Sequence, residues 1–198
     1  MRLPLAALCL ALSFAPAAAQ TVEDGFEAYD AGDYATAKTI LLPLAEAGDA
    51  QAMNLVGYMY DLGKGFPKDV SIACDWYEKS ALEDYAGGQS NLSLCFREGS
   101  GRSKDLEAAL RWEIKAAENG HLESQISLIR HYKDRDLEKT RYWVRKALLS
   151  GTTISRVAAW YAHVEHEGPS ASLLDKACIV VVNGILRRPW RACDDVLR

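Results

Sequence analysis

The sequence lacks the features on which a membrane-spanning protein or a general nucleic-acid binder depends. After the N-terminal segment, no run of about 18 apolar residues occurs, so no membrane-spanning helix is predicted. The 23 Lys and Arg residues are outnumbered by 27 Asp and Glu residues, which gives a formal net charge of −4. A general nucleic-acid binder needs a positive field, and this charge balance does not provide one. The 198 residues are 49% hydrophobic and 25% charged, a composition that favours a folded domain over a disordered chain.

Motifs of the common enzyme classes are also absent. The chain has no H-E-x-x-H zinc motif, no G-x-x-x-x-G-K-[ST] phosphate loop and, beyond residue 19, no S-x-x-K serine motif. His163 and His166 are three residues apart, but no third metal ligand is evident, and we interpret them as a polar helix end. The sequence therefore predicts a non-enzymatic protein with no catalytic residue, metal or cofactor.

The first 19 residues have the composition of a signal peptide. Arg2 supplies a positive charge, and residues 3–14 form an apolar stretch too short to cross a bilayer. Small residues at 17–19 precede the expected cleavage site, which we place between Ala19 and Gln20. We predict export to the periplasm, or secretion, in a bacterium.

Four cysteines remain after this cleavage, and an exported protein is expected to pair them. Three pairings are possible, and we favour the two that close short loops, Cys74–Cys95 and Cys178–Cys193. The alternative is four buried free thiols. Cys9 lies within the signal peptide, and Leu8 before it occupies the position where a lipid anchor requires a small residue.

The middle of the chain repeats itself at an offset of 36 residues. A further copy follows at an offset of 31, because its loop lacks five residues. Matches of so many distinct residue types do not arise readily by chance. The matched pairs are Tyr60 and Phe96, Gly63 and Gly99, Gly65 and Gly101, Asp69 and Asp105, Ala73 and Ala109, Trp76 and Trp112, Lys79 and Lys115, and Ala81 and Ala117.

Each repeat has the pattern of two helices joined by a loop. Ala52, Val56 and Tyr60 are spaced four apart, which predicts one side of a first helix. Gly63 ends that helix, and Asp69 provides an N-cap for the second. A single hairpin cannot bury its apolar side, so the hairpins must stack. We predict about five units in a domain of residues 20–198, at 21–48, 49–84, 85–120, 121–151 and 152–184, with a C-terminal cap at 185–198.

The repeat resembles the Sel-one-like repeat, a 36-residue relative of the tetratricopeptide repeat. The resemblance rests on the pattern A-x(3)-[LV]-G-x-x-Y-x-x-G-x-G-x(3)-D-x(3)-A-x-x-W-Y-x-K-[AS]-A, which begins at Ala52. It implies an all-α, right-handed α-solenoid that acts as a scaffold or adaptor and binds a protein or peptide of the cell envelope on its concave side. Some secreted relatives imply an alternative, a weak hydrolase or binder of β-lactam or cell-wall-like substrates.

Candidate partner-binding residues are the first-helix positions that lie outside the packing pattern. Tyr58, Leu94, Arg130 and Tyr161 occupy one such position in successive units. Tyr and Arg often dominate interface energetics, which favours this row. Outside these helices, the basic segment at residues 187–191 is interpreted either as part of the C-terminal cap or as a docking site for an acidic partner. The second candidate row consists of Leu55, Asn91 and Ser127.

Overall fold

The computed structural model describes residues 20–149 of the chain. Within this range every regular element is a helix, and the all-α repeat solenoid predicted from the sequence is confirmed. The predicted signal peptide, the fifth unit, the C-terminal cap, Tyr161, His163, His166, Cys178, Cys193 and residues 187–191 lie outside the described residues. The helices are α1 (Val22–Asp30), α2 (Tyr34–Glu46), α3 (Ala50–Leu62), α4 (Val70–Leu82), α5 (Ala86–Glu98), α6 (Leu106–Glu118), α7 (Leu122–Tyr132) and α8 (Leu137–Leu149).

Local sequence signals set where these helices begin and end. The carboxylates of Asp69 and Asp105 each accept two backbone N–H bonds at the starts of α4 and α6, so the predicted N-caps are confirmed. At the ends of α3 and α5, Gly63 and Gly99 adopt left-handed conformations with φ of 70° and 75°. Each of these hairpins therefore consists of a helix that ends at a glycine, a loop, and a second helix that begins at an aspartate cap.

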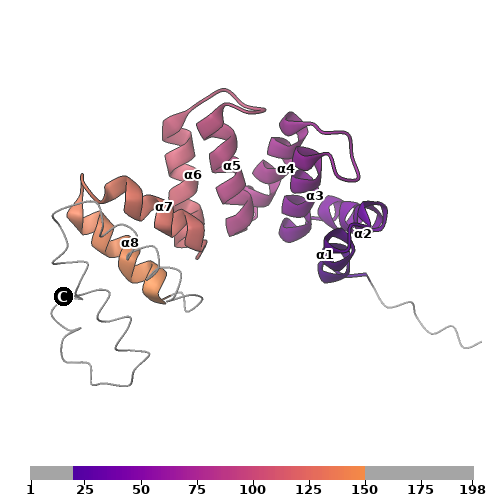
Figure 1. Ribbon diagram of the computed structural model, residues 1–198, viewed down its shortest axis with the longest axis horizontal. Coiled ribbons are helices and arrows are strands. Elements are labelled where there is room, and N and C mark those ends of the chain that lie inside the picture. The colour runs from indigo at the N-terminus through magenta and orange to yellow at the C-terminus, as the bar shows by residue number, and fades with distance from the viewer. Residues whose placement is uncertain (1–19, 150–198) are drawn as a thin grey trace, which may run out of the picture.

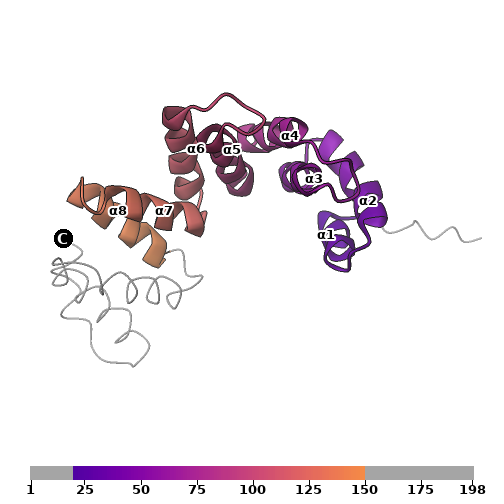
Figure 2. The ribbon, with the colours of Figure 1, turned by 45° about the horizontal axis from the view of Figure 1, so that its top comes forward.

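The hairpins stack side by side into an arc (Figures 1 and 2). Figure 2 shows α1 and α3 along the inner side of this arc, with their hairpin partners α2 and α4 outside them. The contacts agree with the curvature, because α1 contacts α3 and α3 contacts α5 across successive hairpins. The first helices of the first three hairpins thus line the concave side.

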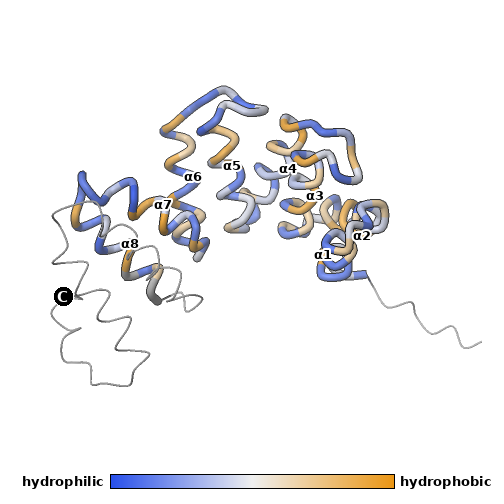
Figure 3. The backbone as a smooth tube through the Cα atoms, viewed as in Figure 1, coloured by the Kyte–Doolittle hydropathy of each residue, from blue (hydrophilic) through white to orange (hydrophobic). Residues whose placement is uncertain are grey.

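Small and apolar residues at repeated positions form the core. Ala52, Gly88 and Ser124 occupy one position in successive units, and all three are buried. Figure 3 shows hydrophobic and hydrophilic stretches alternating along the helices, as amphipathic packing requires. Trp143 is buried, whereas the Trp76 and Trp112 rings are half-buried beneath lysine ammonium groups. These cation–ring distances are 4.0 Å for Lys79 on Trp76 and 4.4 Å for Lys115 on Trp112.

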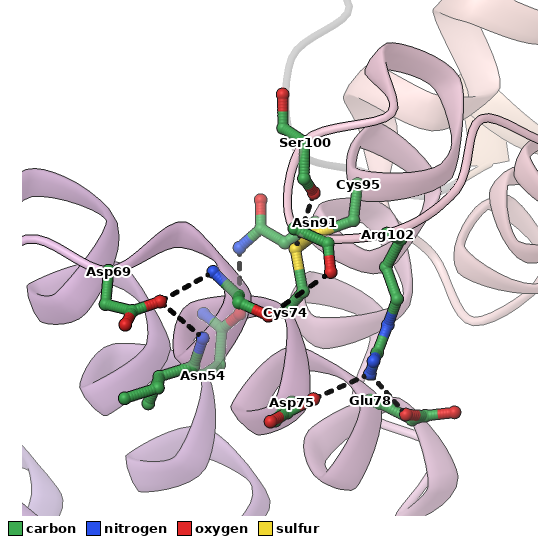
Figure 4. The surroundings of a disulfide bond; sticks show 12 residues. Asn54, Asp69, Cys74, Asp75, Glu78, Asn91, Cys95, Ser100 and Arg102 are labelled. Carbon is green, nitrogen blue, oxygen red and sulfur yellow. Dashed lines mark hydrogen bonds and ion pairs between the residues drawn. A yellow bond between two sulfur atoms is a disulfide. The ribbon is translucent and has the colours of Figure 1, made fainter.

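A disulfide and a pair of ion bridges fasten the second unit to the third (Figure 4). Cys74 on α4 is bonded to Cys95 on α5, with their Cα atoms 6.2 Å apart and both side chains buried. Beside the disulfide, the Arg102 guanidinium lies 3.0 Å from the Asp75 carboxylate and 2.5 Å from that of Glu78. These bonds join helix α4 to both the first helix and the loop of the next unit.

Buried glutamines make a second, repeated connection between units. Gln89 and Gln125 occupy equivalent positions, and each Nε2 donates to the last carbonyls of the preceding hairpin, at Ala81 and Ala117. The Gln89 Oε1 also accepts at 3.0 Å from Nδ2 of Asn119, which lies at the end of α6 in the same hairpin and also donates to the Asp84 carbonyl. These amide-to-carbonyl bonds fix the relative positions of neighbouring units and offset part of the cost of burying the amides, although the buried Oε1 of Gln125 has no hydrogen-bond partner.

His121, the N-cap of α7, is expected to make the free energy of unfolding depend on pH. The Nδ1 atom of His121 accepts from the backbone N–H of Ser124, which requires an unprotonated nitrogen. Burial lowers the pKa of His121 from 6.5, although the carboxylates of Glu123 and Glu113 act in the opposite direction. The unfolded chain therefore takes up the proton first, and the free energy of unfolding falls as the pH drops below 6.5. Above that pH the contribution is fully present.

A matched variant separates this effect from general acid denaturation. His121→Asn keeps an N-cap oxygen but does not titrate near neutral pH, so its stability is expected to change less between mildly basic and mildly acidic pH. Thermal unfolding of both proteins over that range measures the difference. Parallel stability curves would show that His121 does not contribute.

Candidate functional site

The inner helices place most of the first predicted row at the surface. Tyr58 on α3 and Leu94 on α5 are 41% and 42% exposed. Arg130 on α7 is also exposed, and Tyr161 lies outside the described residues. Because α3 and α5 contact one another, Tyr58 and Leu94 lie on adjacent inner helices. The part of the row that the structure describes is available to a partner.

The second predicted row is more involved in packing. Leu55, Asn91 and Ser127 are half-buried. Asn91 Nδ2 donates to Asn54 Oδ1 at 2.9 Å, so this amide joins α5 to α3, and Figure 4 shows both residues beside the disulfide. The second row therefore connects the inner helices and offers less surface to a partner than Tyr58 and Leu94 do.

A tyrosine cluster at the first two units was not predicted from the sequence. The ring of Tyr29 on α1 lies 5.3 Å from that of Tyr34 and 6.0 Å from that of Tyr58, measured between centroids. The Lys64 ammonium, from the loop after α3, lies 5.2 Å from the Tyr29 ring and 5.0 Å from the Tyr34 ring. Both distances are within the range of cation–π attraction.

The electrostatics of the cluster favour a positive charge next to a neutral Tyr29. Hydrogen bonds to the hydroxyls of Tyr34 and Tyr29 raise the pKa of the Lys64 ammonium. Burial raises the pKa of Tyr29, and this effect is larger than the opposite effect of the nearby Lys64 ammonium. Burial, followed by the Asp61 carboxylate, raises the pKa of Tyr77 behind the cluster. With its pKa raised, Tyr29 stays neutral at physiological pH, and its hydroxyl can accept a hydrogen bond from a cation.

Acidic side chains accompany the aromatic ones on both inner helices. Phe26, Tyr29 and Asp30 follow a spacing of three and four along α1, and Tyr58 and Asp61 are three apart on α3. Residues at these spacings share one side of a helix. Because the Tyr29 and Tyr58 rings are in contact, the two sides form one surface. We call these five residues the aromatic–acidic face.

The charge of the solenoid changes sign along its length. Residues 20–84 contain 13 acidic and four basic residues, a net charge of −9. Residues 85–149 contain nine acidic and 12 basic residues, a net charge of +3. The aromatic–acidic face lies in the acidic part, whereas Arg130 lies in the basic part. An extended ligand on the inner side would therefore encounter opposite fields at the two ends.

The described part of the chain contains neither a cluster of metal ligands nor a membrane-spanning helix. Between residues 20 and 149, no group of three or more His, Cys, Asp or Glu side chains is arranged to hold a metal ion. None of the helices from α1 to α8 is both long enough and apolar enough to cross a membrane.

Known proteins resemble this chain in both sequence and structure. The Sel1 repeat family model matches residues 50–85, 86–121 and 131–151. A Sel1 repeat protein from Oxalobacter formigenes is 27% identical with a TM-score of 0.65, and the match covers 84% of this chain and 69% of that chain. A protective antigen of uropathogenic Escherichia coli strains, which displays an SLR fold, is 29% identical with a TM-score of 0.58. That match covers 72% of this chain and 33% of the antigen. Among curated proteins, no sequence matches the chain.

Proposed function

Because the chain belongs to the Sel1 repeat family, we propose that it is a scaffold that binds a protein or peptide of the bacterial cell envelope on its inner face. Sel1 repeat proteins generally act as scaffolds for protein–protein interaction, and the family is typically non-enzymatic. The observation that carries the proposal is the exposure of Tyr58 and Leu94 on adjacent inner helices.

The chemistry of this surface suits protein recognition. Large apolar side chains exposed at equivalent repeat positions bury apolar area when a partner docks. Arg130 continues the row on α7 with a residue type that often anchors interfaces. The Asn54–Asn91 hydrogen bond and the disulfide hold the second and third units in a fixed relation. A fixed surface loses less conformational entropy when it binds.

The first part of the proposal, the location, is tested by following the protein in cells. Export with removal of residues 1–19 predicts a mature N-terminus at Gln20 in the periplasmic or extracellular fraction. N-terminal sequencing of the purified native protein measures it. Recovery of the intact chain from the cytoplasm would contradict export.

The inner-face site is tested by photo-crosslinking in the native envelope. A photoreactive phenylalanine analogue in place of Tyr58 or Leu94 is expected to capture one discrete partner. The matched controls place the analogue at Ile72 or Leu106, which are 37% and 60% exposed on outer helices α4 and α6. Adducts from the inner positions alone would support the proposal. The same adducts from the outer positions, or none from any position, would overturn it.

A further inference from the structure

The tyrosine cluster already accommodates a cation from its own chain. The Lys64 side chain reaches back from the loop after α3, and its ammonium lies over the rings of Tyr29 and Tyr34. The neighbouring hydroxyls stabilise its charged form. A surface that holds an ammonium in this way has the geometry that a cationic side chain from outside also requires.

The surroundings favour an external cation over an external anion. By their helical spacing, Asp30 and Asp61 lie on the same helix sides as Tyr29 and Tyr58, so this side of each helix carries a carboxylate as well as a ring. The net charge of −9 over residues 20–84 attracts positive partners and repels negative ones. The local contacts and the wider field therefore select the same sign of charge.

Exposed apolar surface adds a further constraint on the ligand. Phe26 and Tyr58 are 44% and 41% exposed on neighbouring inner helices. A free metal ion or small inorganic cation would leave this surface uncovered. A peptide that carries a charged side chain and apolar neighbours covers the rings and pairs with the carboxylates. Arginine suits both contacts, because its planar guanidinium stacks on aromatic rings and pairs with carboxylates through several donors.

We propose that the aromatic–acidic face binds an arginine or lysine side chain of an extended segment of the partner protein. The cation stacks on Tyr58, pairs with Asp61 and competes with Lys64 for the Tyr29 ring. This inference rests on the proposed function and specifies which end of the inner face recognises positive charge.

Matched peptides test the charge requirement on the full mature protein. The probe is a fluorescent nonapeptide of Gly, Ser and Leu with two arginines, and its control replaces both arginines with citrulline, which has the same shape but no charge. Fluorescence anisotropy at low ionic strength measures the dissociation constants, and the citrulline peptide is expected to bind about tenfold more weakly than the arginine peptide. Arginine amide is expected to compete only at much higher concentration than the peptide. Competition at an equal concentration would identify a small-cation site and overturn the peptide assignment.

Variants then locate the binding on the molecule. Tyr58→Leu keeps an exposed apolar side chain but removes the aromatic ring, and Asp61→Asn removes one charge; each is expected to weaken arginine-peptide binding about three- to tenfold. Lys64→Gln removes the internal competitor and is expected to tighten binding about threefold. Lys68→Gln is the matched control, because it removes the same charge from the same loop but leaves Lys64 over the tyrosine rings. It is therefore expected to tighten binding less than Lys64→Gln does. Equal melting temperatures of the variants establish that folding is intact.

The possible failures are distinct. Equal binding of the arginine and citrulline peptides, or no binding of either, would overturn the cation site. Weaker binding of the arginine peptide by Lys64→Gln would show that Lys64 supports the site and does not compete for it, and would also overturn the proposal. Crosslinks from Tyr58 and Leu94 to an envelope partner test the scaffold role separately, and they would leave that role standing even if the peptides show no preference for charge.

Discussion

Replacing Cys74 and Cys95 together with alanine is expected to lower the free energy of unfolding by about 3 kcal/mol. The disulfide closes a loop between residues 21 apart in sequence, and a loop of that size restricts the unfolded chain by about this amount. The measurement is equilibrium unfolding in urea, followed by far-UV circular dichroism. A variant with the wild-type midpoint and slope would contradict the prediction.

The shape of the transition carries additional information. In a linear repeat array, each unit is stabilised by its neighbours, and the disulfide joins α4 of one unit to α5 of the next. Its removal weakens this coupling, so a broader or two-step transition is expected. The same experiment tests the untested pairing of Cys178 with Cys193. If that bridge exists, reductant present during unfolding destabilises the double variant further; if those thiols are free, reductant has no effect.

The repeated part of the chain was predictable because each signal acts locally and occurs more than once. A glycine that ends a helix and an aspartate that caps the next need only their own hairpin, and the structure confirms Asp69 and Asp105 in this role. The Cys74–Cys95 bond follows from stacking, since the second helix of one unit lies against the first helix of the next.

The tyrosine cluster was less predictable because its residues come from different kinds of segment. The first unit does not follow the 36-residue register, so Tyr29 and Tyr34 had no equivalent positions by which to assign them. Lys64 belongs to a loop whose path over the rings depends on the packing of α1 against α3. The one available signal was the spacing of Phe26, Tyr29 and Asp30, which repeats in Tyr58 and Asp61.

The sequence also did not reveal that two facing positions of the hairpin carry different residue pairs in successive units. Arg97 and Glu113 pair within the third hairpin, and Glu113 is buried. In the second hairpin, Asp61 and the buried Tyr77 occupy the same two positions. A charged residue is rarely buried without its partner, so neither change can be interpreted alone. Only the contact between the two helices shows that the substitutions compensate each other.

Gly101→Ala, at the junction of the second and third units, is expected to lower the free energy of unfolding by about 3 kcal/mol. Gly101 has a φ of +67°, where a side chain costs about 1–2 kcal/mol. An added Cβ would also lie 2.6 Å from the Val70 carbonyl oxygen and 2.8 Å from the Ser71 Cα, both backbone atoms at the start of α4. Neither atom can move without displacing the helix, and collisions of this kind cost a further 1–3 kcal/mol, approximately.

Gly120→Ala is the matched control, because it separates the backbone cost from the collision. Gly120 has a φ of +90°, and a Cβ there would meet nothing within 4 Å. Its expected loss is therefore the backbone cost alone, about 1–2 kcal/mol. Urea unfolding of both variants measures the difference, and equal losses would show that the loop does not press on α4. A displaced loop would also break the Ser71 hydroxyl bond to the Gly101 carbonyl and move Arg102 from Asp75 and Glu78. Faster amide exchange at the start of α4 in Gly101→Ala, but not in Gly120→Ala, would therefore establish that this loop transmits stability from the third unit to the second.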